Sequence, residues 1–528
     1  MSYRPAGPGW EEQEPEFPTR GRVGLWLRFL LAGVVVIVLT AGATATAGLL
    51  EVQGFVDDLK AGGTIRGAER VIERADVGDP RTILLLGSDH RFGDDKRNAR
   101  SDTMMLVHID PDAPATTVLS IPRDLRVSFR TRDGALHVDR KINETYTDGG
   151  EALTAQVITD TFRIPINNIA NVNFRGFREA IDAIGCVYVD VDHRYYHSNI
   201  GLAPSQQYAE IDIMPGYQMM CGQRALDYVR YRHGDNDLVR GARQQDFLRQ
   251  IRSQYNAQDF IDDPHKLTKV IGKRMQTDKT LQSKEALIDL GKLIAFSASK
   301  PIQQVAIRPL YTNGVDGASY VEMAPGEAER VRREFLNPAA APKAPARKAA
   351  RKGGGRGKRA AGQPASSSTG NDGLYDMGET GKQYALQLGF MRIPVYYPRW
   401  IPNSAGYMTP NSGAEGGYPL RYRMKAADGK MKAAYRLVVN VGGDAFPGNY
   451  MGVQGLAWTD PPILKNPSAD HRTVNGKKLD LYYDGTRLRL VAWRQPRAVY
   501  WISNTLEKRL SNEQMLRIAG SLTRLGGR

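Results

Sequence analysis

The sequence predicts a mixed α/β protein with one membrane-spanning helix near its N-terminus and a small α+β domain at its C-terminal end. Three observations lead to this prediction: an uncharged run at 29–50, three short β-type apolar runs between 82 and 121, and a hairpin signal followed by a capped helix near the C-terminus. The 528 residues are enough for two or three domains with full-sized cores.

The uncharged run has 22 residues, which at about 1.5 Å per residue is long enough to cross a hydrocarbon core of about 30 Å. Three arginines precede it and three acidic residues follow it: Arg20, Arg22, Arg28, Glu51, Asp57 and Asp58. The positive-inside rule then predicts a single-pass cell-membrane protein with a cytoplasmic N-terminus and its bulk outside the cytoplasm. The alternative is a cleaved signal peptide, whose apolar run is usually shorter.

The net charge of +15 favours anionic partners, and more than half of the excess lies in one segment. Residues 343–359 hold eight basic side chains and no acidic one among Ala, Pro and Gly, which is typical of a disordered linker. On the outer side of a membrane this segment does not meet nucleic acid. An anionic envelope polymer, lipid headgroups or water remain as its surroundings.

These patterns divide the chain into six parts. We predict a cytoplasmic tail (1–28), a transmembrane helix (29–50), a connecting segment (51–79), a first folded domain (80–336), a basic linker (337–373) and a separate α+β domain (374–528). In the last part, Asp484-Gly485 indicates a hairpin, AVYWISNT a strand, and Ser511 with Gln514 a capping box. Its aromatic residues suit a core or, alternatively, stacking on sugar rings.

Three apolar runs open the first folded domain, at 82–87, 103–109 and 116–121. The short links between them predict antiparallel neighbours, so the end of the first, the start of the second and the end of the third meet at one sheet edge. That edge collects Asp89, Arg91, Arg100, Asp102, Arg123 and Asp124. Carboxylates among arginines suit Mg²⁺ or Mn²⁺ bound together with a phosphate or pyrophosphate. Surface salt bridges and turn caps are the alternative.

A second basic cluster follows near residue 230. The segment VRYR alternates so that Arg230 and Arg232 share one face of a predicted strand. The segment after it predicts a helix with Arg240, Arg243 and Phe247 on one side and Gln244 adjacent. If both clusters face one cleft, they present more arginines than fold stability requires.

In their order along residues 80–255, six motifs resemble those of the LytR-CpsA-Psr family: GSDHR, RSDTMML, SIPRDLRV, KINETY, FRGFREAIDAIGCV and CGQRALDYVRYRHGDNDLVRGARQQ. The resemblance implies an αβα sandwich with an apolar tunnel for a polyprenyl tail. It also implies a metal-dependent phosphotransferase that moves a glycopolymer from a polyprenyl-pyrophosphate carrier to a peptidoglycan hydroxyl.

Carried over by motif, the resemblance implies a role for each candidate residue. Asp89 and Asp102 hold Mg²⁺ (or Mn²⁺), with Arg100 beside it. The pyrophosphate is held by Arg123, Arg230, Arg232, Arg240 and Arg243, with Lys141 and Gln244 less firmly assigned. Asp124 or a metal-bound carboxylate accepts the proton of the attacking hydroxyl, and the sequence does not choose between them.

The two cysteines, Cys186 and Cys221, stand at landmarks of the family, where Cys186 replaces the second glycine of a Gly-Gly pair. They suggest a disulfide, with two buried thiols as the alternative.

Other functions remain open: a non-catalytic polymer- or lipid-binding protein, and a pyrophosphatase that uses water. A transcriptional regulator would need a cytoplasmic DNA-binding module, for which the short tail has no room. The motifs do not name the glycopolymer, the oligomeric state, the tunnel residues or the role of the last domain.

Overall fold

The computed structural model describes residues 53–88, 101–203, 207, 209–231, 237–255, 275–297, 299–313, 319–340, 373–408, 419–442, 448–466 and 468–526. None of the helices within these ranges is both long and apolar enough to span a membrane. The predicted tail at 1–28 and the predicted span at 29–50 lie outside the described residues, as does the linker from 341 to 372. Residues 53–62, in the predicted connecting segment, are helical.

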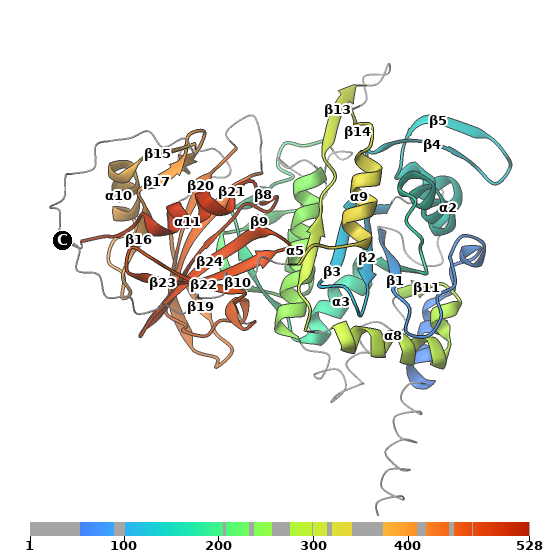
Figure 1. Ribbon diagram of the computed structural model, residues 1–528, viewed down its shortest axis with the longest axis horizontal. Coiled ribbons are helices and arrows are strands. Elements are labelled where there is room, and N and C mark those ends of the chain that lie inside the picture. Colours follow the sequence, from blue (N-terminus) through green and yellow to red (C-terminus); the bar gives the residue numbers. More distant parts are fainter. Residues whose placement is uncertain are drawn as a thin grey trace, which may run out of the picture. The chain divides into compact units, whose positions relative to one another are not determined.

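A six-stranded sheet forms the centre of the first half, in the order β11-β6-β1-β2-β3-β12 (Figure 1). Its strands are β1 (Arg81–Ser88), β2 (Ser101–Ile109), β3 (Thr116–Ile121), β6 (Asn168–Asn173), β11 (Met275–Thr277) and β12 (Ile302–Val305). β1 and β2 pair antiparallel, as do β2 and β3, which confirms the predicted pairing. Leu84, Leu106 and Leu119 stand opposite one another in this register, and all three are fully buried.

Helices cover both faces of this sheet. They are α2 (Glu144–Phe162), α3 (Phe174–Ile184), α4 (Gly222–Arg230), α5 (Asp237–Gln254), α8 (Lys284–Ser297) and α9 (Glu327–Leu336). Ile158 of α2 and Phe335 of α9 pack with Leu84 on one face, whereas Leu248 of α5 packs with Val118 on the other. The strands therefore carry apolar residues on both sides, and the domain is mixed α/β, as predicted.

The prediction of a strand at VRYR is wrong. α4 continues through Arg230, and Tyr231 caps it with extended dihedrals (φ −54°, ψ 136°). Four alternating residues are too few to define a strand when the preceding turns already bury Leu226 and Val229 on one face of a helix. Arg230 is thus the last residue of a helix, and Arg232 lies outside the described residues.

Short strand pairs surround the sheet. They are β4 (Arg126–Arg130) with β5 (Leu136–Lys141), β7 (Val187–Val191) with β10 (Gly216–Met220), β8 (Tyr195–His197) with β9 (Ile211–Ile213), and β13 (Pro309–Asn313) with β14 (Ser319–Met323). The β4–β5 hairpin ends at Lys141, which brings this residue back beside the end of β3.

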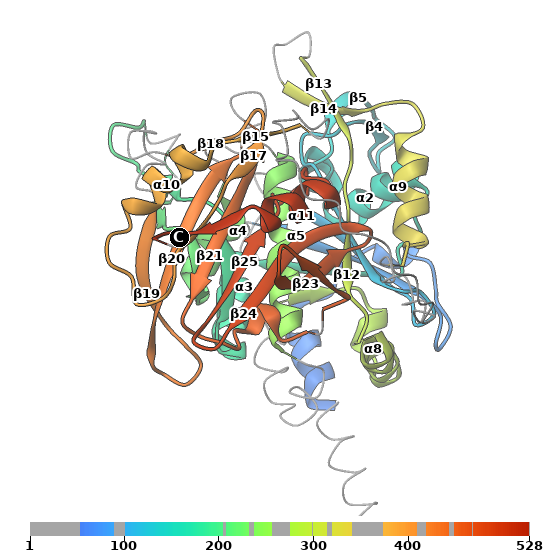
Figure 2. The ribbon, with the colours of Figure 1, turned by 60° about the vertical axis from the view of Figure 1, so that its left-hand side comes forward.

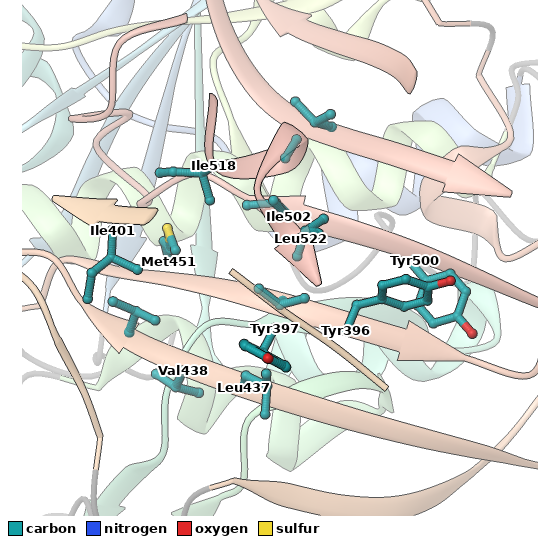
Figure 3. Packing of buried hydrophobic residues seen from close by; sticks show 14 of the residues in the cluster. Tyr396, Tyr397, Ile401, Leu437, Val438, Met451, Tyr500, Ile502, Ile518 and Leu522 are labelled. Atoms are coloured by element: carbon teal, nitrogen blue, oxygen red, sulfur yellow. The ribbon is translucent and has the colours of Figure 1, made fainter. Parts of the chain in front are cut away.

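The C-terminal part is built on an eight-stranded sheet of β18 (Gly406–Tyr407), β19 (Leu420–Lys425), β20 (Met431–Asn440), β21 (Tyr450–Leu456), β22 (Asp470–Val474), β23 (Lys477–Asp484), β24 (Arg487–Gln495) and β25 (Ala498–Ser503). Beside it lie β15 (Leu374–Asp376), α10 (Gly378–Leu386), β16 (Tyr396–Pro398), β17 (Trp400–Pro402), α11 (Asn512–Gly520) and β26 (Leu522–Arg524). Figure 3 shows its core, where Tyr396 and Tyr500 lie side by side among aliphatic side chains.

Local signals in this part predict its elements well. Ser511 and Gln514 form the predicted capping box at the start of α11. The predicted hairpin exists, but Asp484 pairs with Arg487, so its two-residue loop is Gly485-Thr486, one residue further along. Trp493 and Trp501 are buried in cores, which is the first of the two roles considered for the aromatic residues.

Residues 54–528 form one compact unit, so the C-terminal part packs against the α/β part instead of standing apart from it. Tyr217 of β10 lies in a hydrophobic cluster with Leu456 and Trp501. Arg436 Nη1 lies 2.9 Å from Asp190 Oδ1, and Trp501 Nε1 donates to Asp190 Oδ2 at 3.2 Å. These buried contacts fasten β7 and β10 to the C-terminal sheet.

Candidate active site

One carboxylate joins two of the predicted phosphate-binding arginines. Asp237 Oδ2 lies 3.5 Å from Arg123 Nε, and Asp237 Oδ1 lies 3.2 Å from Arg240 Nη2. Arg123 follows β3 by two residues, whereas Asp237 and Arg240 belong to the first turn of α5. The structure thus brings Arg123 and Arg240 together from positions more than a hundred residues apart in the chain.

Close packing of α5 on β3 makes this meeting possible. A Cβ atom at Gly241 would lie 2.9 Å from the Cβ of Ser120, a distance that real Cβ atoms do not tolerate. The hydroxyl of Ser120 donates to the carbonyl of Gly241 at 3.3 Å. Glycine at 241 therefore lets the start of α5 lie directly on the end of β3, with Arg240 next to Arg123.

Lys141 joins the same cluster through Asp124. Its Nζ lies 2.9 Å from Asp124 Oδ1, and Asp124 Oδ2 lies 3.7 Å from Arg123 Nε. The amide of Asn143 donates to the carbonyl of Arg123 at 3.2 Å, which fixes the end of the β4–β5 hairpin against this turn. Five charged side chains, three basic and two acidic, therefore form one chain of ion pairs at the end of β3.

Gln244 connects the start of β2 with two helices. Its Nε2 donates to Thr103 Oγ1 at 3.0 Å and to the carbonyl of Val229 at 3.1 Å. Thr103 directly follows Asp102, whose backbone lies in β2 and whose side chain is outside the described part. Gln244 thus places α4 and α5 beside the strand that carries a predicted metal ligand.

Arg230 and Arg243, two further predicted phosphate-binding residues, contact other side chains: Asp227 for Arg230, and aromatic rings for Arg243. Arg230 Nη2 lies 3.1 Å from Asp227 Oδ1, and burial raises the pKa of the Asp227 carboxyl while Arg230 opposes the rise. Arg243 is fully buried, donates to the carbonyl of Tyr231 at 2.8 Å and lies 4.5 Å from the ring centroid of Tyr195. Arg243 thus lies buried beside aromatic rings.

A cleft with an open volume of about 580 Å³ lies at this edge of the sheet. Its walls come from the end of β3, the first turns of α5 and the end of β12, and they include Asp237, Arg240 and Gln244. A third wall, Leu506 to Lys508, comes from the C-terminal part.

The sequence analysis predicted neither Asp237 nor this wall. The spacing of Asp237 three residues before Arg240 was a usable signal, whereas nothing local in the sequence indicates the wall.

Several predicted site residues lie outside the described part of the chain, namely Asp89, Arg91, Arg100, Arg232 and the side chain of Asp102. Within the described part, one group of side chains has metal-ligand spacing: Asp182, Cys186 and Cys221. The two cysteines form a disulfide at the positions that the sequence suggested, with an S–S distance of 1.99 Å, so they offer no thiolate to a metal.

Comparison with known proteins places the site in a family. Residues 58–336, more than half of the chain, match the LytR_cpsA_psr family model. The chain is 32% identical over 218 residues to the polyisoprenyl-teichoic acid–peptidoglycan teichoic acid transferase TagU of Oceanobacillus iheyensis, covering 40% of this chain and 62% of TagU. It is 30% identical over 213 residues to an uncharacterised protein of Staphylococcus aureus, covering 39% of this chain and 50% of that protein.

Another relative is the teichoic acid transferase TagT of Bacillus subtilis, 24% identical over 332 residues, which cover 62% of this chain and 98% of TagT. A crystal structure of B. subtilis TagV is 24% identical with a TM-score of 0.39, and covers 49% of this chain and 98% of that chain. The chain spans between one half and two thirds of the length of the O. iheyensis and S. aureus relatives. By the match over residues 58–336, the chain belongs to the LytR_cpsA_psr family.

Proposed function

We propose that this protein is a membrane-anchored phosphotransferase that acts outside the cytoplasm and moves a glycopolymer from a polyprenyl-pyrophosphate carrier to a peptidoglycan hydroxyl. The observation that carries the proposal is the chain of ion pairs that brings Arg123, Lys141 and Arg240 together, beside a cleft that Asp237 and Arg240 line. Family membership supports it, as do relatives named teichoic acid transferases.

The proposed reaction exchanges one phosphorus–oxygen bond for another. The oxygen of a peptidoglycan hydroxyl forms a bond to the polymer-side phosphorus, the bridging bond of the pyrophosphate breaks, and polyprenyl phosphate leaves with the electron pair. Arg123 and Arg240 offset the charge that develops on the leaving phosphate, and Lys141 adds to the positive field. Asp124 or a metal-bound carboxylate accepts the hydroxyl proton, and the ion pairs of Asp124 with Arg123 and Lys141 support the first choice.

A divalent cation is the proposed cofactor. Two carboxylates, Asp89 and Asp102, are a donor set suited to Mg²⁺ or Mn²⁺. When bound, the cation would neutralise phosphate charge. Arg100 would lie beside the cation. Arg230, Arg232 and Gln244 belong to the same proposal as pyrophosphate-binding side chains. Arg243, which is buried beside the rings of Tyr195 and Tyr231, is proposed as a further pyrophosphate-binding side chain.

The test uses the full chain in detergent with a polyprenyl pyrophosphate and Mg²⁺, and measures phosphate release. We expect release by the wild type and none by Arg123→Ala or Asp89→Ala, with the thermal unfolding temperature of both variants near that of the wild type. Arg399→Ala is the matched control, because Arg399 is exposed and pairs with Asp376 in the C-terminal part. Release by both site variants at the wild-type rate would remove these residues from the mechanism.

Transfer is separated from hydrolysis by adding a peptidoglycan fragment as acceptor. A phosphodiester product supports the transferase. Phosphate release that continues unchanged, without such a product, supports the pyrophosphatase alternative. Lipid binding with neither product supports a non-catalytic binding protein.

A further inference from the structure

The third wall of the cleft comes from a part of the chain beyond the family match. Leu506, Glu507 and Lys508 belong to the loop 504–510, which connects β25 to α11. The family model ends at residue 336. Figure 2 shows the C-terminal sheet and α11 on the side of α5, and the ion pair between Arg249 of α5 and Asp484 of β23 places them in contact.

The loop 504–510 has a fixed shape. The side chain of Asn504 accepts from the amide of Leu510 at 3.2 Å and donates to the carbonyl of Leu488 at 2.8 Å. Arg487 Nη2 donates to the carbonyl of Lys508 at 2.7 Å. Lys508 has a φ of +54°, a left-handed conformation that a non-glycine residue keeps only where its surroundings hold it. The loop therefore presents its residues to the cleft in a prepared arrangement.

Buried charges fasten this loop to the α/β part. Lys508 Nζ lies 2.5 Å from Asp484 Oδ2 and also donates to Gln304 Oε1. Gln304 of β12 donates its backbone amide to Asp484 Oδ1 at 2.8 Å and its side-chain amide to the carbonyl of Ala242 in α5 at 3.1 Å. Through Gln304, the loop is held against the same helix turn that carries Arg240.

Glu507 gives this wall its chemical character. Its Oε2 accepts from Asn449 Nδ2 at 2.9 Å and from Arg509 Nε at 3.0 Å. Within the part of the chain that the structure describes, both of its side-chain hydrogen bonds use Oε2, so Oε1 remains as an acceptor for a ligand. A carboxylate repels a pyrophosphate but accepts hydrogen bonds from sugar hydroxyls. Gln245 lines the same cleft, and its side-chain amide suits the same partner.

We propose that the loop 504–510 is the saccharide-contacting wall of the cleft and that Glu507 determines acceptor specificity by binding a hydroxyl of the acceptor sugar beside the reacting phosphate. This inference rests on the proposed transferase function. It divides the cleft by charge, with the pyrophosphate at the Arg123 and Arg240 edge and the neutral sugar at the Glu507 wall.

The experiment compares the wild type with Glu507→Gln, Glu507→Asp and Lys508→Met as full chains. The donor is a polyprenyl-pyrophosphate-linked N-acetylglucosamine, and the acceptor is a soluble peptidoglycan disaccharide. We expect Glu507→Gln to raise the KM for the acceptor by about 10-fold, because the hydrogen bond to the sugar hydroxyl then has a neutral acceptor in place of a charged one. Glu507→Asp should recover part of this loss. Lys508→Met should raise the same KM, because it releases the loop.

Glu513→Gln in α11 is the matched control, since Glu513 is exposed, and we expect wild-type constants for it. An unchanged acceptor KM in Glu507→Gln, with transfer by the wild type, overturns this inference and leaves the proposed function intact. A rise in the KM for the donor alone also overturns it, because Glu507 would then contact the donor. No transfer and no phosphate release by the wild type contradicts the proposed function itself.

Discussion

The carboxylate of Asp237 lies 3.5 Å from Arg123 Nε, although the two residues come from different elements on opposite sides of a helix–strand contact. The same carboxylate lies 3.2 Å from Arg240 Nη2. Asp237 therefore holds the guanidinium groups of Arg123 and Arg240 next to each other. Its position in the first turn of α5 also suits the positive end of the helix dipole.

Asp237→Asn should weaken binding of the lipid pyrophosphate. The amide keeps the shape of the carboxylate but loses the charge that orients both arginines, and hydrogen bonds to charged groups contribute about 1.5 to 3 kcal/mol each. We expect kcat/KM for phosphate release to fall by about 10- to 100-fold. Asp212→Asn, at a carboxylate that is 52% exposed and pairs with Arg194, is the control. An unchanged kcat/KM in Asp237→Asn would show that the arginines orient without it.

Gln244→Ala should raise the Mg²⁺ concentration that gives half-maximal activity. Gln244 holds Thr103, the neighbour of the proposed ligand Asp102, and loss of such supporting contacts typically weakens metal binding by about 10- to 100-fold. A titration of activity with Mg²⁺ measures the change. Gln387→Ala, at an exposed position of the C-terminal part, should follow the wild-type curve. Coincident curves for all three proteins would contradict a link between Gln244 and the metal.

Removal of the disulfide should destabilise the protein. Cys186 and Cys221 are separated by 35 residues, and closing a loop of that length contributes about 3 to 4 kcal/mol by chain entropy. We expect the double variant Cys186→Ala/Cys221→Ala to lose this amount in the free energy of unfolding, measured by chemical denaturation.

A reductant provides the control for that measurement. Dithiothreitol should lower the stability of the wild type to that of the double variant, and it should leave the double variant unchanged. If the reductant has no effect on the wild type, the cysteines in the purified protein are thiols.

Asp484→Asn should lower the free energy of unfolding, and the size of this loss should depend on pH. Burial tends to raise the pKa of Asp484, but Lys508 and Arg249 hold the pKa below its ordinary value. A carboxyl with a lowered folded-state pKa stabilises the protein fully above the unfolded value of about 3.9, and this contribution disappears as the pH falls through the folded-state pKa. The substitution leaves Lys508 and Arg249 without their shared counter-charge.

We therefore expect Asp484→Asn to lower the free energy of unfolding by about 3 to 5 kcal/mol at pH 7. The difference from the wild type should stay constant between about pH 5 and pH 7 and shrink below about pH 4. Denaturation at several pH values measures it, with Asp460→Asn as an exposed control. Equal stability of wild type and variant at pH 7 would mean that the ion pairs of Asp484 with Arg249 and Lys508 do not stabilise the folded protein.

The sequence by itself determined the strands at 82–87, 103–109 and 116–121, the capped helix after Ser511 and the membership of a family whose motifs follow one order. These features depend on short-range patterns, which are apolar alternation, turn lengths and side-chain caps, so they can be read without knowing the fold. The prediction of a strand at VRYR was wrong because it also used a short-range pattern. Its four residues overlap the end of the helix Gly222–Arg230, whose packing determines their conformation.

Only the tertiary structure decided which charges meet. It joined Arg123 to Asp237 and Arg240, and it left Arg243 beside aromatic rings. It also placed Glu507 in the wall of a cleft whose other walls belong to the α/β part. Residue spacing gives the direction of a side chain along one helix or strand, but contacts between elements depend on how closely the elements pack. Here that packing depends on Gly241 against Ser120 and on Asp484 buried between Arg249 and Lys508.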